Sequence, residues 1–262
     1  MLRKILLVLS MSLMTAGPAL AAHPLITDDT GTQGKGKFQL ELNGELSWDK
    51  ETLAGVETRE NAGELAAVLS AGVVDDLDIV IGFPWQWSRV KEDGAVAASG
   101  NGPGDMSLEV KWRFFKREGF SLALKPGLTI PTGNEDKGLG NGKASYGATL
   151  IATQEWERFF VHVNGAYTRN EFKLDVDKES NRSNIWHASI AGGAEVVKDL
   201  KVVANIGMET NGDRGSNTWP AFVIGGVIYS VSENLDVDLG VKGGLNKPEP
   251  DLALLAGMAM RF

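Results

Sequence analysis

Alternation between apolar and polar residues recurs along most of the chain and constrains its fold more than any other feature. In the segment KFQLELNGELSW, one parity carries Phe38, Leu40, Leu42, Leu46 and Trp48, while the other carries charged or polar residues. Successive side chains of a β-strand point to opposite faces, so a period of two predicts strands with one apolar face and one polar face. Helical periodicity is nearly absent, and we therefore predict an all-β chain.

The pattern predicts about twelve strands, each of roughly 9–12 residues, which is the length that a tilted strand needs to cross a membrane. We expect them near residues 38–48, 62–73, 77–87, 106–114, 122–130, 144–153, 159–168, 185–196, 200–208, 221–231, 235–245 and 252–262. Five short turns alternate with six longer polar loops, which is typical of outer-membrane barrels with short periplasmic turns. We therefore predict an antiparallel transmembrane β-barrel of about 12 strands with both termini periplasmic.

A soluble β-sandwich would also alternate, with its apolar face buried in a core. The charges and the aromatic residues favour the barrel instead. The apolar parity of the clearest strands carries no charge, as expected where charged side chains at the bilayer midplane are costly. Aromatic residues gather near the predicted strand ends, where membrane interfaces favour them. The candidates for this interface role are Trp48, Trp85, Trp87, Trp186 and Phe262.

The polar parity mixes acidic and basic residues, as expected for strands that face a narrow water-filled lumen. These pore-lining candidates are Glu41, Glu45, Asp78, Glu109, Lys111, Arg113, Lys125, Asp236, Asp238, Lys242 and Arg261. Lys111, Arg113 and Lys125 are expected to form a basic stripe on two neighbouring strands, and the acids near the two chain ends are expected to form an acidic wall. His162, Asn164 and Asn205 are expected simply to fill the lumen.

Both ends of the chain carry features of an exported barrel. Residues 1–21 read as a signal peptide, with Arg3 and Lys4, an apolar stretch and a small-residue cleavage site. Residues 22–36 are expected to form a leader that lies on the periplasmic side or enters the lumen, and residues 37–262 are expected to form the barrel. The terminal Phe262 resembles the closing aromatic residue of outer-membrane barrels, which the barrel assembly machinery recognises. The chain is therefore expected in the cell outer membrane, in contact with its lipids.

The charge balance argues against a nucleic-acid partner. The full chain has 26 basic and 34 acidic side chains, and removing Arg3 and Lys4 with the signal leaves 24 against 34, a net charge of −10. Such an acidic product is poorly suited to bind a phosphate backbone.

The motifs HPLITDDTGTQGKGKFQLEL, GPGDMSLEVKWRFF and LKPGLTIPTGN resemble the outer-membrane family labelled putative meta-pathway phenol degradation proteins, often called transporters. The resemblance runs from His23 through Gly147 and plausibly to the chain end. It implies a barrel and the passage of small organic or aromatic compounds, and it supplies no catalytic residues.

Two groups of polar residues are candidate sites. Asp28 and Asp29 in the leader either pair with basic residues in the lumen or belong to a solvated segment. His187 and Ser189 share a strand face, as in outer-membrane phospholipases, but no orienting acid or amide is evident nearby. Three histidines and no cysteine argue against a transition-metal centre, and no cofactor is expected.

The expected function is therefore a non-enzymatic channel for the passive passage of small solutes, among them aromatic or hydrophobic compounds. Two alternatives remain open at this point. One is a plugged barrel with a structural or adhesive role, because twelve strands lie between filled barrels and open porins. The other is a hydrolase that uses His187 and Ser189.

Overall fold

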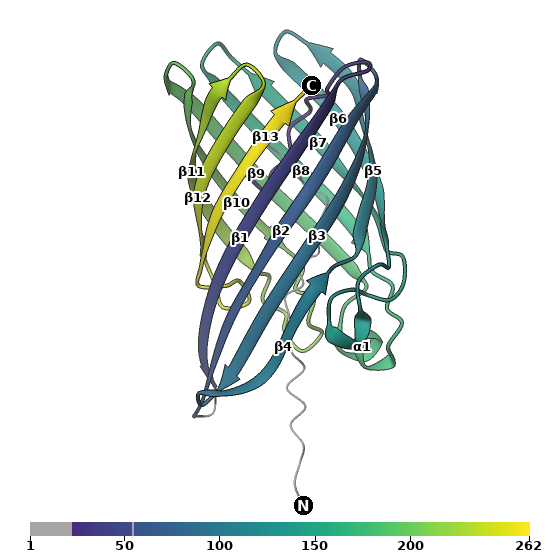
Figure 1. Cartoon of the computed structure of the whole chain (residues 1–262), viewed down its shortest axis with the longest axis vertical. Helices are drawn as coiled ribbons and strands as arrows, with labels where there is room; N and C mark the ends of the chain where they lie inside the picture. The colour runs from purple at the N-terminus through teal and green to yellow at the C-terminus, as the bar shows by residue number, and fades with distance from the viewer. Residues whose placement is uncertain (1–22, 54) are drawn as a thin grey trace, which may run out of the picture.

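The computed structural model describes residues 23–53 and 55–262, so the predicted signal peptide lies outside the described residues. These residues form a closed antiparallel β-barrel (Figure 1). The strands are β1 (Phe38–Leu53), β2 (Val56–Val74), β3 (Leu77–Glu92), β4 (Ala95–Pro103), β5 (Met106–Arg117), β6 (Phe120–Ile130), β7 (Tyr146–Glu155), β8 (Phe159–Arg169), β9 (Asn184–Val197), β10 (Leu200–Glu209), β11 (Ala221–Ser232), β12 (Leu235–Gly244) and β13 (Leu252–Arg261). The helical segments are η1 (Glu135–Lys137) and α1 (Asp175–Ser180).

The barrel has twelve strand positions although thirteen strands are labelled. The first part of β3, from Leu77 to Gly82, pairs with β5, and its last part, from Trp85 to Glu92, pairs with β4. β4 and β5 thus follow one another along a single position in the wall. β1 pairs with β13 and closes the ring, so every strand except β4, which pairs only with β3, has at least two neighbours. The prediction of an antiparallel barrel of about 12 strands is confirmed.

Closure reaches the last residue of the chain. The Phe38 N–H donates to the Phe262 carbonyl at 3.1 Å, and the Phe262 N–H donates to the Phe38 carbonyl at 2.9 Å. An open edge in lipid would leave such backbone groups without partners at a cost of several kcal/mol each, by order of magnitude. The terminal strand is therefore ordered because it forms the seam of the barrel.

The two faces of the wall are inverted relative to a soluble protein. Large apolar side chains on alternate positions are exposed, for example Leu46 at 44% and Leu239 at 62%. Their inward neighbours are polar and buried, for example Asp78 and Lys125, each at 1%. This is the arrangement that lipid outside and polar contacts inside require.

Five tight turns lie at one end of the barrel, where the C-terminus also lies (Figure 1). We call this the short-turn end, and the opposite end the long-loop end. The tight turns join β2–β3, β5–β6, β7–β8, β9–β10 and β11–β12, as the sequence predicted. No helix among the described residues is long and apolar enough to cross a membrane.

The prediction was wrong at two connections of the long-loop end. Residues 49–61 and 88–105 were expected as loops, but β1, β2, β3 and β4 run through them as two long hairpins (Figure 1). In the β1–β2 hairpin, ion pairs join Glu57 to Lys50 at 2.7 Å and to Arg59 at 2.6 Å. Strands that rise into water need no apolar face, so the alternation that reveals a membrane strand is lost there.

Candidate functional site: the leader inside the barrel

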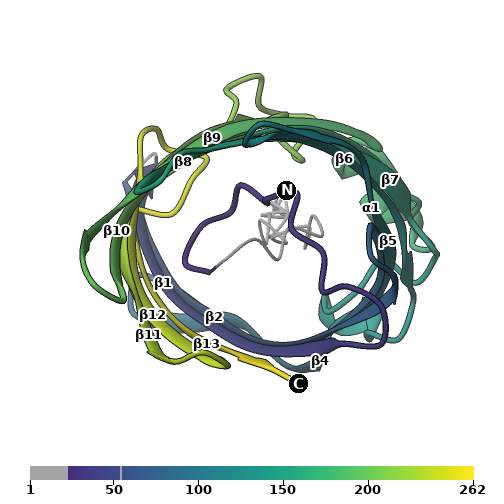
Figure 2. The ribbon, with the colours of Figure 1, turned by 90° about the horizontal axis from the view of Figure 1, so that it is seen from above.

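The leader, residues 23–36 of the described chain, lies inside the ring of strands (Figure 2). Its path starts at β12, where the His23 ring hydrogen-bonds to Asp238. It ends at β3, where the Gln33 N–H donates to the Asp78 carboxylate at 3.0 Å. The segment therefore crosses the lumen before the chain enters β1.

An ion-pair cluster holds the middle of the leader. Asp28 is fully buried, and its carboxylate accepts hydrogen bonds from Lys111 of β5 at 2.8 Å and from Lys125 of β6. Lys111 also lies 3.9 Å from Asp29. Burial raises the pKa of the Asp28 carboxyl, but the two ammonium groups lower it by more, so the pKa lies below its ordinary value. Asp28 is therefore held as an anion between two cations.

Two inward asparagines bind the leader backbone. Asn205 of β10 accepts through Oδ1 from the N–H groups of Ile26 at 2.8 Å and Thr27 at 3.1 Å. Asn164 of β8 accepts from the Asp28 N–H at 2.6 Å and donates to the Asp28 carbonyl at 2.9 Å. An amide offers both a donor and an acceptor, so it can replace the strand partner that an extended segment in the lumen lacks. These residues bind the leader; the expectation that they only fill space was incomplete.

Apolar leader residues fit hollows in the wall. Gly226 and Gly240 lie opposite one another on β11 and β12, and a Cβ built on either would come within 2.9 Å of Pro24. Leu25 is 3% exposed and packs in a cluster with Ala191, Val203 and Ile228. Glycine is needed at the two hollows because any larger residue would displace the proline.

The remaining leader contacts come from hydroxyl groups. The Thr30 N–H donates to Thr153 of β7 at 3.2 Å, and the Thr30 hydroxyl lies 2.5 Å from that of Ser121 on β6. Thr153 also hydrogen-bonds to His162 at 3.0 Å. The wall thus presents partners to the leader on most strands from β5 to β12.

All eleven pore-lining candidates lie on the inner side of the wall, but most are engaged in pairs. Lys242 binds Glu45 at 2.9 Å, Arg261 binds Asp236 at 2.6 Å, and Arg113 binds Asp76 of the β2–β3 turn at 2.6 Å. The expected basic stripe is divided between Asp28 and Asp76. The expected acidic wall is partly neutralised by Lys242 and Arg261. The charges therefore do not form two opposed walls of uniform sign.

Three of these acids accept no hydrogen bond from a cationic side chain among the described residues. Glu109 is 1% exposed and lies 3.9 Å from Lys125, with no hydrogen bond to either carboxylate oxygen. Glu41 and Asp78 are buried and accept hydrogen bonds only from neutral groups among the described residues.

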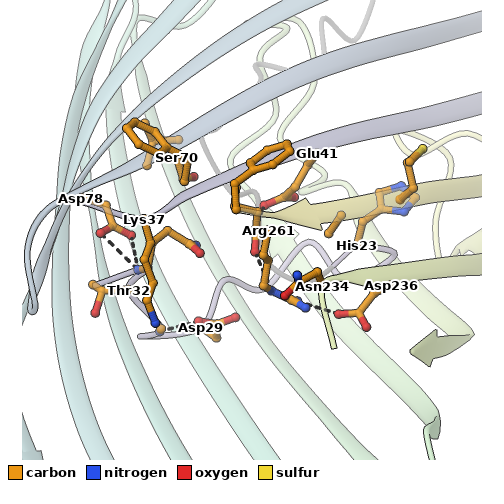
Figure 3. Close-up of a pocket in the computed structure, with 18 of the residues that line it drawn as sticks. His23, Asp29, Thr32, Lys37, Glu41, Ser70, Asp78, Asn234, Asp236 and Arg261 are labelled. Carbon is orange, nitrogen blue, oxygen red and sulfur yellow. Dashed lines mark hydrogen bonds and ion pairs between the residues drawn. The ribbon is translucent and has the colours of Figure 1, made fainter. Parts of the chain in front are cut away.

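Two cavities lie among the described residues, of which one borders the leader and the other has no leader residue in its lining. One, of about 550 Å³, is at the short-turn end, where wall residues such as Asp236 and Arg261 and leader residues such as Asp29 and Thr32 surround the same space (Figure 3). The other, of about 790 Å³, lies at the long-loop end beside Ser47, Arg89 and Lys137. Polar and apolar atoms line both, and the volumes are in the range of small-molecule sites.

The candidate hydrolase pair is not assembled. The Ser189 hydroxyl is buried without a hydrogen-bond partner, and the His187 ring lies 3.6 Å from Glu209 instead. Among the described residues, no group of three or more His, Asp or Glu side chains could hold a metal ion.

The interface aromatics all lie on the outer surface. Trp48, Trp85, Trp87, Trp186 and Phe262 have between 37% and 62% of their area exposed. Trp85 and Trp87 are in mid-strand rather than at a strand end, because β3 continues to Glu92.

Residues 27–262 match the model of the family described as "Putative MetA-pathway of phenol degradation". The chain belongs to this family. The whole barrel and most of the leader, including Asp28, fall within the family match. No protein with a curated description matches the chain in sequence.

Solved structures share the fold of this family member at low sequence identity. The COG4313 outer membrane channel from Pseudomonas putida F1 is 16% identical, with a TM-score of 0.69 over 89% of this chain and 98% of that chain. The NanC porin is 9% identical, with a TM-score of 0.56 over 84% and 98%. The translocator domain of the autotransporter NalP from Neisseria meningitidis is 11% identical, with a TM-score of 0.55 over 87% and 89%. These similarities show an outer-membrane barrel fold that serves more than one role.

Proposed function

We propose that this protein is an outer-membrane channel for small solutes, in which the leader forms the constriction. One observation carries the proposal: a cavity of about 550 Å³ lies beside a leader that side-chain contacts hold inside the barrel, and a second cavity of about 790 Å³ lies toward the long-loop end. A lumen lined by charged and polar groups can admit water and polar solutes, as lined pores do.

The solute class rests on the family description and on the size of the cavities. Small organic compounds, with aromatic acids and phenols as the first candidates, are consistent with a family described by a pathway of phenol degradation. Both cavities have apolar as well as polar surface, which suits a ring that carries an ionised or hydroxyl group. The similarity in fold to the COG4313 outer membrane channel supports a channel and does not identify the solute.

The alternative, a closed barrel with a structural or adhesive role, is favoured by the burial of the leader. Pro24, Leu25, Thr27 and Asp28 are all buried, so the leader fills part of the lumen. The hydrolase alternative has no assembled catalytic pair in its favour, and we propose no catalysis.

Conductance in planar bilayers separates channel from plug. The parent is compared with a variant that lacks residues 24–33, after both are shown to be folded by heat-dependent gel mobility. Steady ion flow through the parent, larger in the variant, is expected. If the parent shows no conductance and the variant conducts, the leader is a plug. If neither protein conducts, the channel proposal is refuted. Liposome swelling with benzoate, phenol and sugars then tests the solute class.

A further inference from the structure

The cavity at the short-turn end has an excess of negative charge. Its lining includes six carboxylates, from Asp29, Glu41, Asp78, Glu233, Asp236 and Asp238, and four cations, from Lys37, Lys111, Lys125 and Arg261. Two of the cations, Lys111 and Lys125, already bind Asp28 behind the cavity wall. The space therefore favours a cation over an anion.

Strand register concentrates acceptors at one place in this cavity. Asn43 on β1 and Asp238 on β12 both lie opposite Gly257 of β13, so their side chains flank a residue that has none. Three atoms lie close to the position that a Cβ on Gly257 would take: His23 Nδ1 at 2.6 Å, Asp238 Oδ2 at 2.7 Å and Asn43 Oδ1 at 3.0 Å. Glu41 shares the inward face of β1 and accepts from the Asn43 amide at 3.3 Å.

Two of these side chains are incompletely satisfied: Asn43 lacks a donor to its Oδ1 atom, and Glu41 lacks a cation among the described residues. Asn43 is 6% exposed, lines the cavity, and its Oδ1 atom is buried without a hydrogen-bond partner. Glu41 is 4% exposed and has no ion pair among the described residues; its two hydrogen bonds come from the neutral amides of Gln39 and Asn43. A buried carbonyl and a buried carboxylate without a cation are costly unless a donor reaches them.

We propose that Glu41, Asn43 and Asp238 form a seat for a primary ammonium group. An ammonium has three N–H donors, and the three side chains supply three acceptors, two of them carboxylates. The leader completes the seat, because the His23 ring covers Asp238 by hydrogen-bonding to its other oxygen, Oδ1.

The ammonium has two sources. Cleavage of the predicted signal peptide after Ala21 would create an α-ammonium one residue before His23, which makes the chain's own start the first source. A free amine that enters the cavity is the second. Neither source depends on conduction, so the proposal stands or falls separately from the channel function.

The first arm of the test asks about the chain's own terminus. The cleaved protein is purified in detergent, and acetylation of its α-amine is timed by mass spectrometry at pH 7, against a peptide of the same first ten residues. The matched variants are Glu41→Gln, which removes a seat charge, and Glu45→Gln, an inward residue of the same strand outside the cavity lining. If the α-amine of the cleaved protein occupies the seat, its acetylation should be about tenfold slower than that of the peptide. Glu41→Gln should restore most of that rate and Glu45→Gln none.

The second arm asks about a free amine, with benzylamine as the probe and benzyl alcohol as the neutral control, by saturation-transfer NMR. If the seat is open to solutes, benzylamine binds, benzyl alcohol does not, and Glu41→Gln weakens binding about tenfold. Asn43→Leu removes an acceptor without changing the net charge. Like Glu41→Gln, it should speed acetylation in the first arm or weaken benzylamine binding in the second. Unprotected α-amine together with no benzylamine binding would overturn the proposal. So would effects equal in Glu41→Gln and Glu45→Gln in folded protein.

Discussion

Replacing Asp28 with Asn should release the leader from the lumen. The side chain keeps its shape, but its amide NH₂ would face one of two ammonium groups whose side chains, on Lys111 and Lys125, are only 9% and 2% exposed. Removing one partner of a buried ion pair costs about 3–5 kcal/mol. Because Lys111 keeps Asp29 and Lys125 keeps Glu109, each at 3.9 Å, we expect about 3 kcal/mol, or about 150-fold in the ratio of docked to released leader.

Thermolysin measures this release, because it cleaves before apolar residues such as Leu25 and Ile26, which the docked leader protects. The cleaved fraction of folded barrel is followed by intact mass. Asp29→Asn is the matched control, since the Asp29 side chain is 31% exposed and lies 3.9 Å from Lys111. Asp28→Asn should be cut far faster than the parent and Asp29→Asn nearly as slowly. Adding Lys125→Met to Asp28→Asn should recover part of the protection.

Equal cleavage of the parent, Asp28→Asn and Asp29→Asn would refute the role of the ion pair. Heat-dependent gel mobility of each variant separates release of the leader from loss of the barrel.

Three further predictions follow from the leader and from the wall. The pKa of Asp28 is lowered, so the stabilisation that its charge gives the docked leader is complete above the ordinary pKa of 3.8 and is lost only as the pH falls below that value. Protection of the leader from thermolysin should therefore persist from pH 8 to about pH 5. An acid protease measures the loss of protection at lower pH. Cysteines at Asp93 or Asp177 should label on intact cells and one at Lys198 should not; labelling at Lys198 would reverse the orientation. Phe262→Lys should lower the amount of folded barrel, and unchanged amounts would remove the assembly role.

The barrel itself follows from sequence because lipid imposes a strict rule. Charge is excluded from one parity of each crossing strand, so the face of a residue such as Lys125 can be predicted from its position alone. The tall hairpins escape this rule, since both of their faces meet water. A local signal was present: Asp93 and Gly94 have φ of 45° and 85°, the two positive values of a tight hairpin turn that Asp-Gly favours.

The leader site could be predicted only in part. Parity places Lys111 and Lys125 on the inner face, but their partner Asp28 lies 83 and 97 residues away in sequence. Parity does not give height in the lumen or the direction across it, so many pairings of the inner charges satisfy the pattern equally. Asn164 and Asn205 were missed for the same reason, because an inward amide shows its partner only when the leader is in place.

The glycine hollows beneath Pro24 couple distant parts of the chain. Gly226 and Gly240 belong to the wall, more than 200 positions from the proline that they accommodate. A methyl group added to either would meet the ring of Pro24, and at Gly226 it would also lie 2.8 Å from the Leu239 carbonyl oxygen of the neighbouring strand. Leader and wall should therefore be inherited as a matched set, so that a leader transplanted from one homologue into another seats only where the recipient keeps both hollows.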